Sequence, residues 1–118
     1  MPGIEARDFT SPDETRTPDK TRIELVSLAG GQIGRYTFSP GWRWSECIKP
    51  VAKTDSCQVE HIGHCVSGML HIEHEDGSKE DIVPGKVYRI APGHDAWNHG
   101  SEPAVVVEFQ GAANFAKG

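Results

Sequence analysis

Histidine and cysteine, the side chains that most often bind transition metals, gather in two short stretches of this 118-residue chain. The first stretch, residues 57–68, contains Cys57, His61, His64 and Cys65. The second, residues 92–97, contains His94, and His99 follows just beyond it. We therefore expect any chemical site of this protein to be assembled where the two stretches meet.

Strand geometry limits which of these side chains can bind the same metal ion. Ligand atoms around one ion lie only ~3–4 Å apart, because metal–ligand bonds are about 2.0–2.3 Å long. In a straight strand, which advances about 3.3 Å per residue, Cys57 and His61 would lie roughly 13 Å apart. A corner or bulge near Val59-Glu60 is therefore required if both bind one ion. His61 and His94 are the leading candidates, and the ligands that remain open behind them are Cys57, Glu60, His64, Asp95 and His99.

The rest of the chain has the composition of a β-protein with many turns. It contains 13 Gly and 8 Pro at an apolar fraction of 36%, which favours a sandwich or barrel over a helical bundle. Apolar runs separated by turn residues predict strands at 21–28, 32–38, 42–48, 57–66, 69–74, 78–83, 86–91, 96–99 and 104–109. The β-branched run 104–109 is expected at the centre of a sheet. The predicted fold class is all-β, an antiparallel sandwich or closed barrel of the jelly-roll type.

Two tryptophans offer walls for a pocket near the candidate ligands. Alternation in Trp42-Arg43-Trp44 places both indoles on the same face of the expected strand. Such a face is more often core, and the alternative is an aromatic wall of a binding site. The pocket residues that we predict are Trp42, Trp44, Asp95 and Trp97.

Length and charge limit the organisation and the partners of the chain. We expect a polar N-terminal arm over residues 1–20 and a single β-domain over 21–118. The net charge is −5 and the basic residues are scattered, which argues against nucleic acid as a partner. No apolar run reaches membrane-spanning length and the N-terminus lacks the apolar core of a signal peptide, so we expect no membrane partner. The 3 Cys fit no disulfide framework, and the expected location is the cytoplasm.

Two segments resemble the signature motifs of the cupin superfamily. In the second cupin motif a Pro-Gly turn precedes a metal-binding His and a Gly-Asp-Glu-Pro-like turn follows the strand; residues 85–104 are similar, with Pro92-Gly93-His94 and Gly100-Ser101-Glu102-Pro103. Residues 57–68 resemble the first motif. More narrowly, the chain resembles a group of small single-domain bacterial cupins in five short segments, some of them inside these motifs: Gly41-Trp42-Arg43-Trp44-Ser45-Glu46, Thr54-Asp55-Ser56-Cys57, His61-Ile62-Gly63, Val66-Ser67-Gly68 and Gly93-His94-Asp95-Ala96-Trp97. The resemblance covers the chain from about residue 20 and implies a double-stranded β-helix, the cupin form of the jelly-roll barrel.

The differences from the family pattern fall on the metal ligands. The first motif normally carries a His-x-His pair and a Glu, whereas here Cys57 stands about where the second His would be and His61 about where the Glu would be. The second motif is short, so that either His94 or Asp95 could take its ligand place. The resemblance thus implies a divalent metal site of Cys57, His61 and His94. That set suits zinc better than iron, nickel or manganese.

These observations predict a small metal-binding cupin with a small-molecule site inside the barrel, and they leave open whether it is a metal-dependent enzyme, whose reaction would be unassigned. The alternative is a metal-free cupin that binds a small molecule, as a sensor does, without catalysis. The polar arm and the β-rich body also predict a homodimer in which the N-terminal segment crosses to its partner, as is common in cupins.

Overall fold

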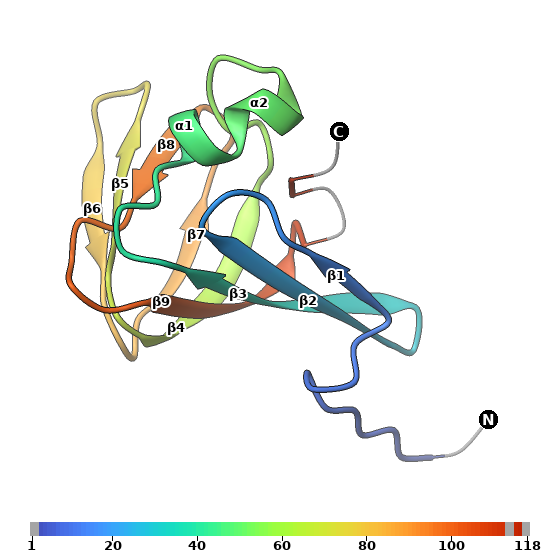
Figure 1. Ribbon diagram of the computed structural model, residues 1–118. Helices are drawn as coiled ribbons and strands as arrows, with labels where there is room; N and C mark the ends of the chain where they lie inside the picture. Colours follow the sequence, from blue (N-terminus) through green and yellow to red (C-terminus); the bar gives the residue numbers. More distant parts are fainter. Residues whose placement is uncertain (1–2, 113–114, 117–118) are drawn as a thin grey trace.

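Two antiparallel sheets face each other in the computed structural model, which describes residues 3–112 and 115–116 (Figure 1). Within these residues, six strands form the larger sheet in the order β1-β2-β3-β9-β4-β7, and three form the smaller in the order β6-β5-β8. The strands are β1 Glu14–Arg16, β2 Thr21–Leu28, β3 Gly31–Phe38, β4 His61–Ser67, β5 Leu70–His74, β6 Lys79–Ile82, β7 Val87–Ile90, β8 His94–Trp97 and β9 Ala104–Gln110. This arrangement confirms the predicted all-β fold of short antiparallel strands.

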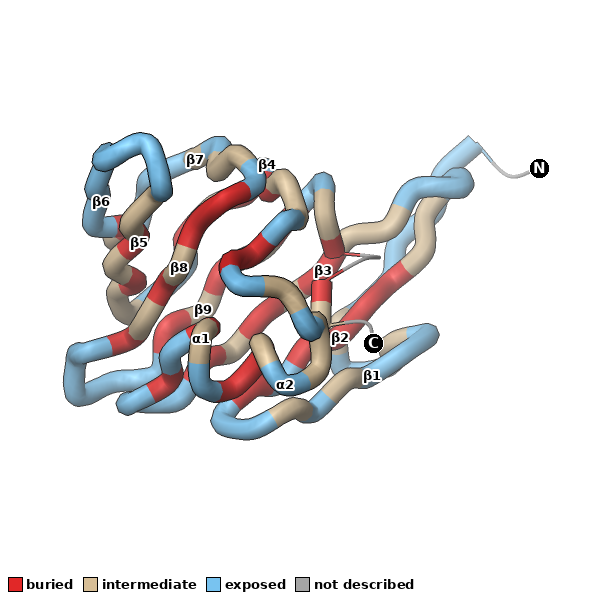
Figure 2. Tube along the Cα trace, turned by 90° about the horizontal axis from the view of Figure 1, so that it is seen from above, coloured by how far each residue is buried: buried red, intermediate tan, exposed pale blue. Residues whose placement is uncertain are grey.

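The core lies between the two sheets, where the buried parts of the trace concentrate (Figure 2). Strand β9 pairs with β3 on one side and β4 on the other, so the predicted central position of the β-branched run is confirmed. Its inward positions are Ala104, Val106 and Glu108, which are all buried. A carboxylate therefore reaches the interior from the middle of the large sheet.

One predicted strand is wrong, because residues 42–48 contain a short helix. Helix α1 spans Trp44–Cys47 and is followed by α2, Lys49–Ala52. The buried residues Trp44, Cys47 and Ile48 recur at helical spacing, and the backbone N–H of Ile48 donates to the carbonyl of Trp44 at 2.9 Å. Alternation over three residues was too short a signal to separate a strand from one helical turn.

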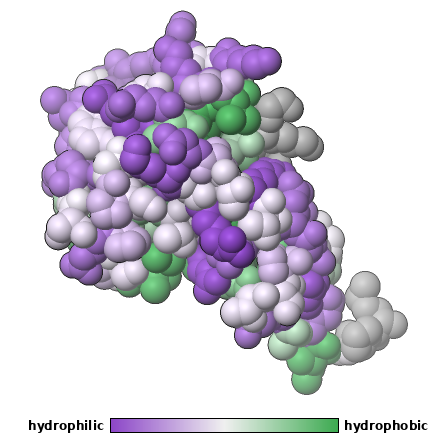
Figure 3. All heavy atoms as spheres, viewed as in Figure 1, coloured by the Kyte–Doolittle hydropathy of each residue, from purple (hydrophilic) through white to green (hydrophobic). Residues whose placement is uncertain are grey.

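The N-terminal residues are only partly separate from the sheets. Strand β1 pairs with β2, so that residues 14–16 form the edge of the larger sheet of their own chain. The residues before it extend away from the barrel, and the face of the molecule in Figure 3 is mostly hydrophilic. The division into an arm and one domain stays a prediction. Across the described parts of the chain, the structure contains no helix of the length and hydropathy needed to cross a membrane.

Candidate metal centre

A backbone bridge holds Cys57 opposite His94. The Cys57 N–H donates to the carbonyl of His94 at 2.8 Å, and the Gly93 N–H donates to the carbonyl of Cys57 at 2.7 Å. Directly opposed residues of an antiparallel pair place their side chains on the same face. Gly93 has φ of 100°, which a residue with a side chain rarely adopts, and it turns the chain into β8 immediately before His94.

His61 reaches the same point because the chain turns a corner after Cys57. Strand β4 begins only at His61, and residues 58–60 are irregular, which confirms the predicted corner. The C-terminal end of β9 lies close against this corner, since a Cβ atom at Gly111 would lie 2.4 Å from the carbonyl oxygen of Glu60. The strand predicted over residues 57–66 therefore begins later than expected, at His61.

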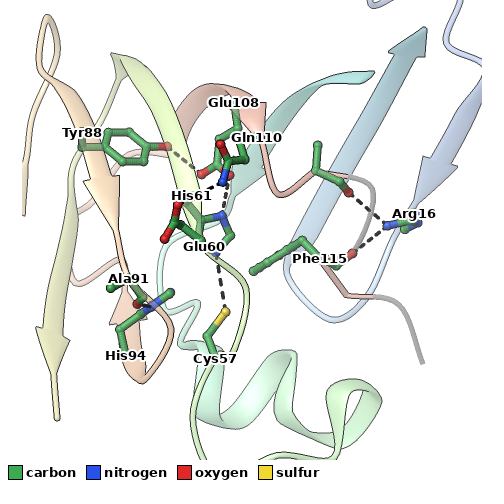
Figure 4. A network of polar contacts seen from close by, with 11 residues as sticks. Arg16, Cys57, Glu60, His61, Tyr88, Ala91, His94, Glu108, Gln110 and Phe115 are labelled. Carbon is green, nitrogen blue, oxygen red and sulfur yellow. Dashed lines mark hydrogen bonds and ion pairs between the residues drawn. The ribbon is translucent and has the colours of Figure 1, made fainter. Parts of the chain in front are cut away.

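Three potential ligand atoms therefore meet inside the barrel. One atom each from Cys57, His61 and His94 lies within 4.8 Å of the others, and Cys57 Sγ is 3.5 Å from His61 Nε2. All three residues are buried, with exposed fractions of 1%, 3% and 3%. Figure 4 shows the Cys57 thiol in contact with the His61 ring, and His94 on the neighbouring strand. The structure thus brings together the three residues predicted as ligands.

The second ring nitrogen of each histidine has a fixed partner. His61 Nδ1–H donates to Glu108 Oε1 at 2.5 Å, and His94 Nδ1–H donates to the carbonyl of Ala91 at 2.7 Å (Figure 4). Each Nε2 is consequently the nitrogen left for a ligand. Metal-binding histidines commonly donate their other N–H to a carboxylate or a backbone carbonyl in this way, which fixes ring orientation.

The electrostatic environment favours a thiolate at Cys57. Burial alone would raise the pKa of Cys57, but hydrogen bonds and positive charge from His61 and His94 outweigh it and lower the pKa to about 6. Burial would lower the pKa of His61, but the Glu108 charge and the Cys57 thiol raise it to about 10. The thiolate is the form of cysteine that binds metals.

Glu108 is the functional residue that the sequence did not reveal. It is buried, and both its oxygens are used, Oε1 by His61 and Oε2 by the Tyr88 hydroxyl, which donates at 2.7 Å. The β-branched run around it was interpreted as core. The signal that would have found it is the period of two, since a lone carboxylate follows Ala104 and Val106 on the buried face.

Two of the four predicted pocket residues line the interior. Trp42 and Trp44 border a cavity of ≈ 30 Å³ that also touches His61, His94 and Glu108. Trp44 lines this cavity from helix α1, and not from the strand that was predicted there.

The other two predicted pocket residues, Asp95 and Trp97, do not line this cavity, so the prediction is wrong for them. Side chains of β8 alternate, so that His94 and Ala96 point inward and Asp95 and Trp97 do not. Asp95 accepts a hydrogen bond from Arg43 Nε at 3.1 Å, and the Arg43 guanidinium lies 4.5 Å from the Trp97 ring centroid.

The remaining candidate ligands also lie elsewhere. Glu60 accepts a hydrogen bond from Arg89 at 2.8 Å on the exterior. His64 occupies an outward position of β4, and His99 belongs to an exposed group with His71 and Asp81. Cys57 is therefore the third member of the buried group, and these other candidates lie outside it.

A larger groove lies next to the cavity. It has a volume of ≈ 660 Å³ and lies between β6 and β7, the end strands of the two sheets. Four residues border both spaces: Ile72, Ile82, Tyr88 and Ile90. The inner cavity and the groove are thus adjacent parts of one candidate binding site.

Comparison with known proteins identifies the fold. The sequence matches no family model and no curated protein. The fold is similar to those of ectoine synthase from P. lautus (TM-score 0.66, 13% identity, 92% of this chain and 78% of that chain) and a sugar phosphate isomerase of the cupin superfamily from Silicibacter pomeroyi (0.63, 17%, 88% and 73%). It is also similar to KdgF from Halomonas sp. (0.59, 17%, 83% and 87%). The chain therefore has the cupin fold, and at these identities the similarity extends to the fold alone.

Proposed function

We propose that this protein is a metal-binding cupin in which Cys57, His61 and His94 hold one zinc ion at the inner end of a small-molecule site. The observation that carries the proposal is the convergence of three buried ligand atoms within 4.8 Å, contributed by two stretches of the chain that lie far apart in sequence.

The chemistry of the ligand set supports zinc. One thiolate and two imidazoles form a soft, borderline set that zinc accepts at tetrahedral geometry, and binding would require His61, whose pKa is about 10, to release its Nε2 proton. Iron, nickel and manganese sites more often include carboxylates. Glu108 and the Ala91 carbonyl would keep both Nε2 atoms directed at the ion. Three protein ligands leave a fourth position, at which a bound zinc ion can polarise a carbonyl group or activate water.

The space around the site supports a small-molecule ligand. The cavity of ≈ 30 Å³ has room for about one water-sized group, and the groove of ≈ 660 Å³ falls within the usual range for small-molecule sites. A ligand would therefore keep most of its body in the groove and extend one end toward His61 and His94.

Zinc content tests the proposal directly. Protein purified without a histidine tag and loaded with zinc is expected to retain one ion per chain after desalting, measured by mass spectrometry of the metal. Cys57→Ala, His61→Ala and His94→Ala should each lower this content strongly. The matched controls Cys65→Ala and His64→Ala remove the same side-chain types from strand β4, next to His61, and should leave the zinc content unchanged. Retention below one ion in ten chains, or equal retention in all variants, would favour the metal-free alternative.

A second candidate function is nucleophilic chemistry at Cys57, favoured by the order of its contacts. The thiol faces His61 Nε2, and His61 Nδ1 faces Glu108, which is the sequence of nucleophile, base and orienting carboxylate. Cys57 also borders a separate pocket of ≈ 150 Å³ with Trp44 and Gln58. Selective alkylation of Cys57 in zinc-free protein, at a rate unaffected by added zinc, would support this function over metal binding.

A further inference from the structure

Two buried polar atoms near the candidate metal centre have no hydrogen-bond partner among the described residues. They are the hydroxyl of Tyr36 and the indole Nε1 of Trp42, in residues with exposed fractions of 0% and 2%. Leaving a buried donor unsatisfied costs about 1–3 kcal/mol, and native structures contain few such groups. A donor in this state therefore points to an acceptor atom outside the protein chain.

Both side chains border the same inner cavity. That cavity of ≈ 30 Å³ also touches His61 and His94, so the donors and the candidate ligands share one space. Much of the remaining wall is apolar and offers no side-chain hydrogen bond: Phe38, Leu70, Ile72, Ile82, Ile90 and Ala96. The occupant that satisfies the two donors must consequently be small and must accept hydrogen bonds.

The two groups can act only as donors to such an occupant. An indole N–H has no acceptor capacity. Burial and the charge of Glu108 raise the pKa of Tyr36 well above its ordinary value, so the phenol keeps its proton. The Glu108 carboxylate accepts from His61 and Tyr88 and also contributes to the raised pKa of Tyr36 through a side-chain interaction, but the Tyr36 hydroxyl makes no hydrogen bond to it of normal geometry.

We infer that Trp42 and Tyr36 donate hydrogen bonds to a terminal carboxylate or carbonyl oxygen of a small organic molecule, which enters the inner cavity from the groove. The body of this molecule lies between β6 and β7, where the walls carry both charge signs, for example Lys79 and Arg89 beside Asp76 and Glu80. The groove therefore suits a polar body. This inference deepens the proposed function by naming the ligand class, and it does not depend on the metal, because the two donors belong to the protein.

Solution NMR of the indole N–H groups tests this inference with acetate and formate as probes. Protein labelled with ¹⁵N has three indole signals, one for each Trp, and these are assigned from Trp44→Phe and Trp97→Phe variants so that Trp42 itself stays intact. Titration with acetate should shift the Trp42 signal in a saturable manner and leave that of Trp97 unchanged. Methylammonium, a cation of similar size that cannot accept a hydrogen bond, should shift neither.

Substitution of the donors gives the complementary measurement. Trp42→Phe and Tyr36→Phe should each weaken acetate binding about tenfold or more, the effect of removing one hydrogen bond to a charged group. Trp97→Phe should not change it, and the zinc content of all three variants should equal that of the unsubstituted protein. The inference is overturned if the Trp42 signal does not respond to either anion, which would mean that the cavity holds water only. Equal acetate affinity in Trp42→Phe would overturn it as well.

The two proposals fail in different ways. Loss of zinc binding with an intact acetate response would contradict the metal site and leave the donor pair standing. Normal zinc binding without an acetate response at Trp42 would contradict the donor pair alone. The titration is therefore carried out on both zinc-free and zinc-loaded protein.

Discussion

At the scale of single residues, the candidate centre consists of three ligands and the groups that orient them. His61 and His94 could be put forward from the residues alone, because histidines near Gly-containing turns stand out in a β-protein, whereas Cys57 entered the set only through the resemblance to cupins. Glu108 could not, because a single carboxylate in an apolar strand carries no chemical signal until its partner His61 is known. The part of the site hardest to predict is thus the one that positions a ligand.

Glu108→Gln tests this positioning role. The substitution keeps the shape of the side chain and removes the charge that faces His61 Nδ1. Loss of such an orienting partner typically lowers metal affinity about 10–100-fold, and we expect zinc affinity to fall by this amount in a chelator competition assay. Glu80→Gln at the exposed edge of the groove is the control. Unchanged affinity in Glu108→Gln would assign Glu108 a purely structural role.

At the scale of elements, the turns and the close approach of strands deliver the ligands. Most strands follow from alternation and turn residues, and their bounds shift by only a few positions in the structure. Two predicted strands differ more. Over residues 42–48, the short alternating pattern was also compatible with a helical turn. Before His61, a corner interrupts the predicted strand. In both places contacts between distant segments, such as the bridge from Cys57 to His94, decide the local conformation.

Gly63 is one element-level requirement that can be tested. A Cβ atom there would lie 2.6 Å from the carbonyl oxygen of Val107 and 2.8 Å from the Tyr88 hydroxyl, so β4 can approach its neighbours only without a side chain. Gly63→Ala should lower the free energy of unfolding by about 1–3 kcal/mol in denaturant titrations, the usual cost of overpacking. Gly31→Ala is the control, because the nearest atom to its Cβ would be 3.6 Å away. Equal stability of both variants would contradict the packing account.

The pairing of β2 with β3 should make part of the free energy of unfolding depend on pH in the acid range. Glu24 lies opposite Arg35, which donates to it at 2.8 and 3.0 Å. These hydrogen bonds lower the pKa of Glu24 below its ordinary value of 4.5, while burial opposes the change. A lowered folded-state pKa contributes stability that is complete above pH 4.5 and is lost as the pH falls through the folded-state value.

The Glu24→Gln variant measures this component. At pH 7 it should be less stable than the unsubstituted protein by about 2 kcal/mol, and the difference should narrow as the pH falls below 4.5. Urea unfolding between pH 7 and pH 3 provides the comparison, with the exposed Glu5→Gln as the control. A difference that stays constant over the whole range would show that the ion pair is not its source.

At the scale of the whole molecule, we propose a homodimer. The edge strand β1 and the extended residues before it offer a segment that a second copy could bind, and the outer face of the larger sheet exposes Ile62, Val66, Val87 and Phe109. Light scattering should give twice the 12.9 kDa of one chain. Deletion of residues 1–12, which leaves β1 intact, should shift the mass toward one chain. A single-chain mass in both proteins would contradict the dimer.

The proposed zinc centre is tested most directly by X-ray absorption at the zinc edge. Zinc-loaded protein should show one sulfur at about 2.3 Å and nitrogen neighbours at about 2.0 Å, with the multiple-scattering pattern of imidazole. In Cys57→Ala the sulfur shell should disappear, and in Cys65→Ala it should remain. A first shell of nitrogen and oxygen alone in the unsubstituted protein would contradict zinc binding by Cys57, His61 and His94.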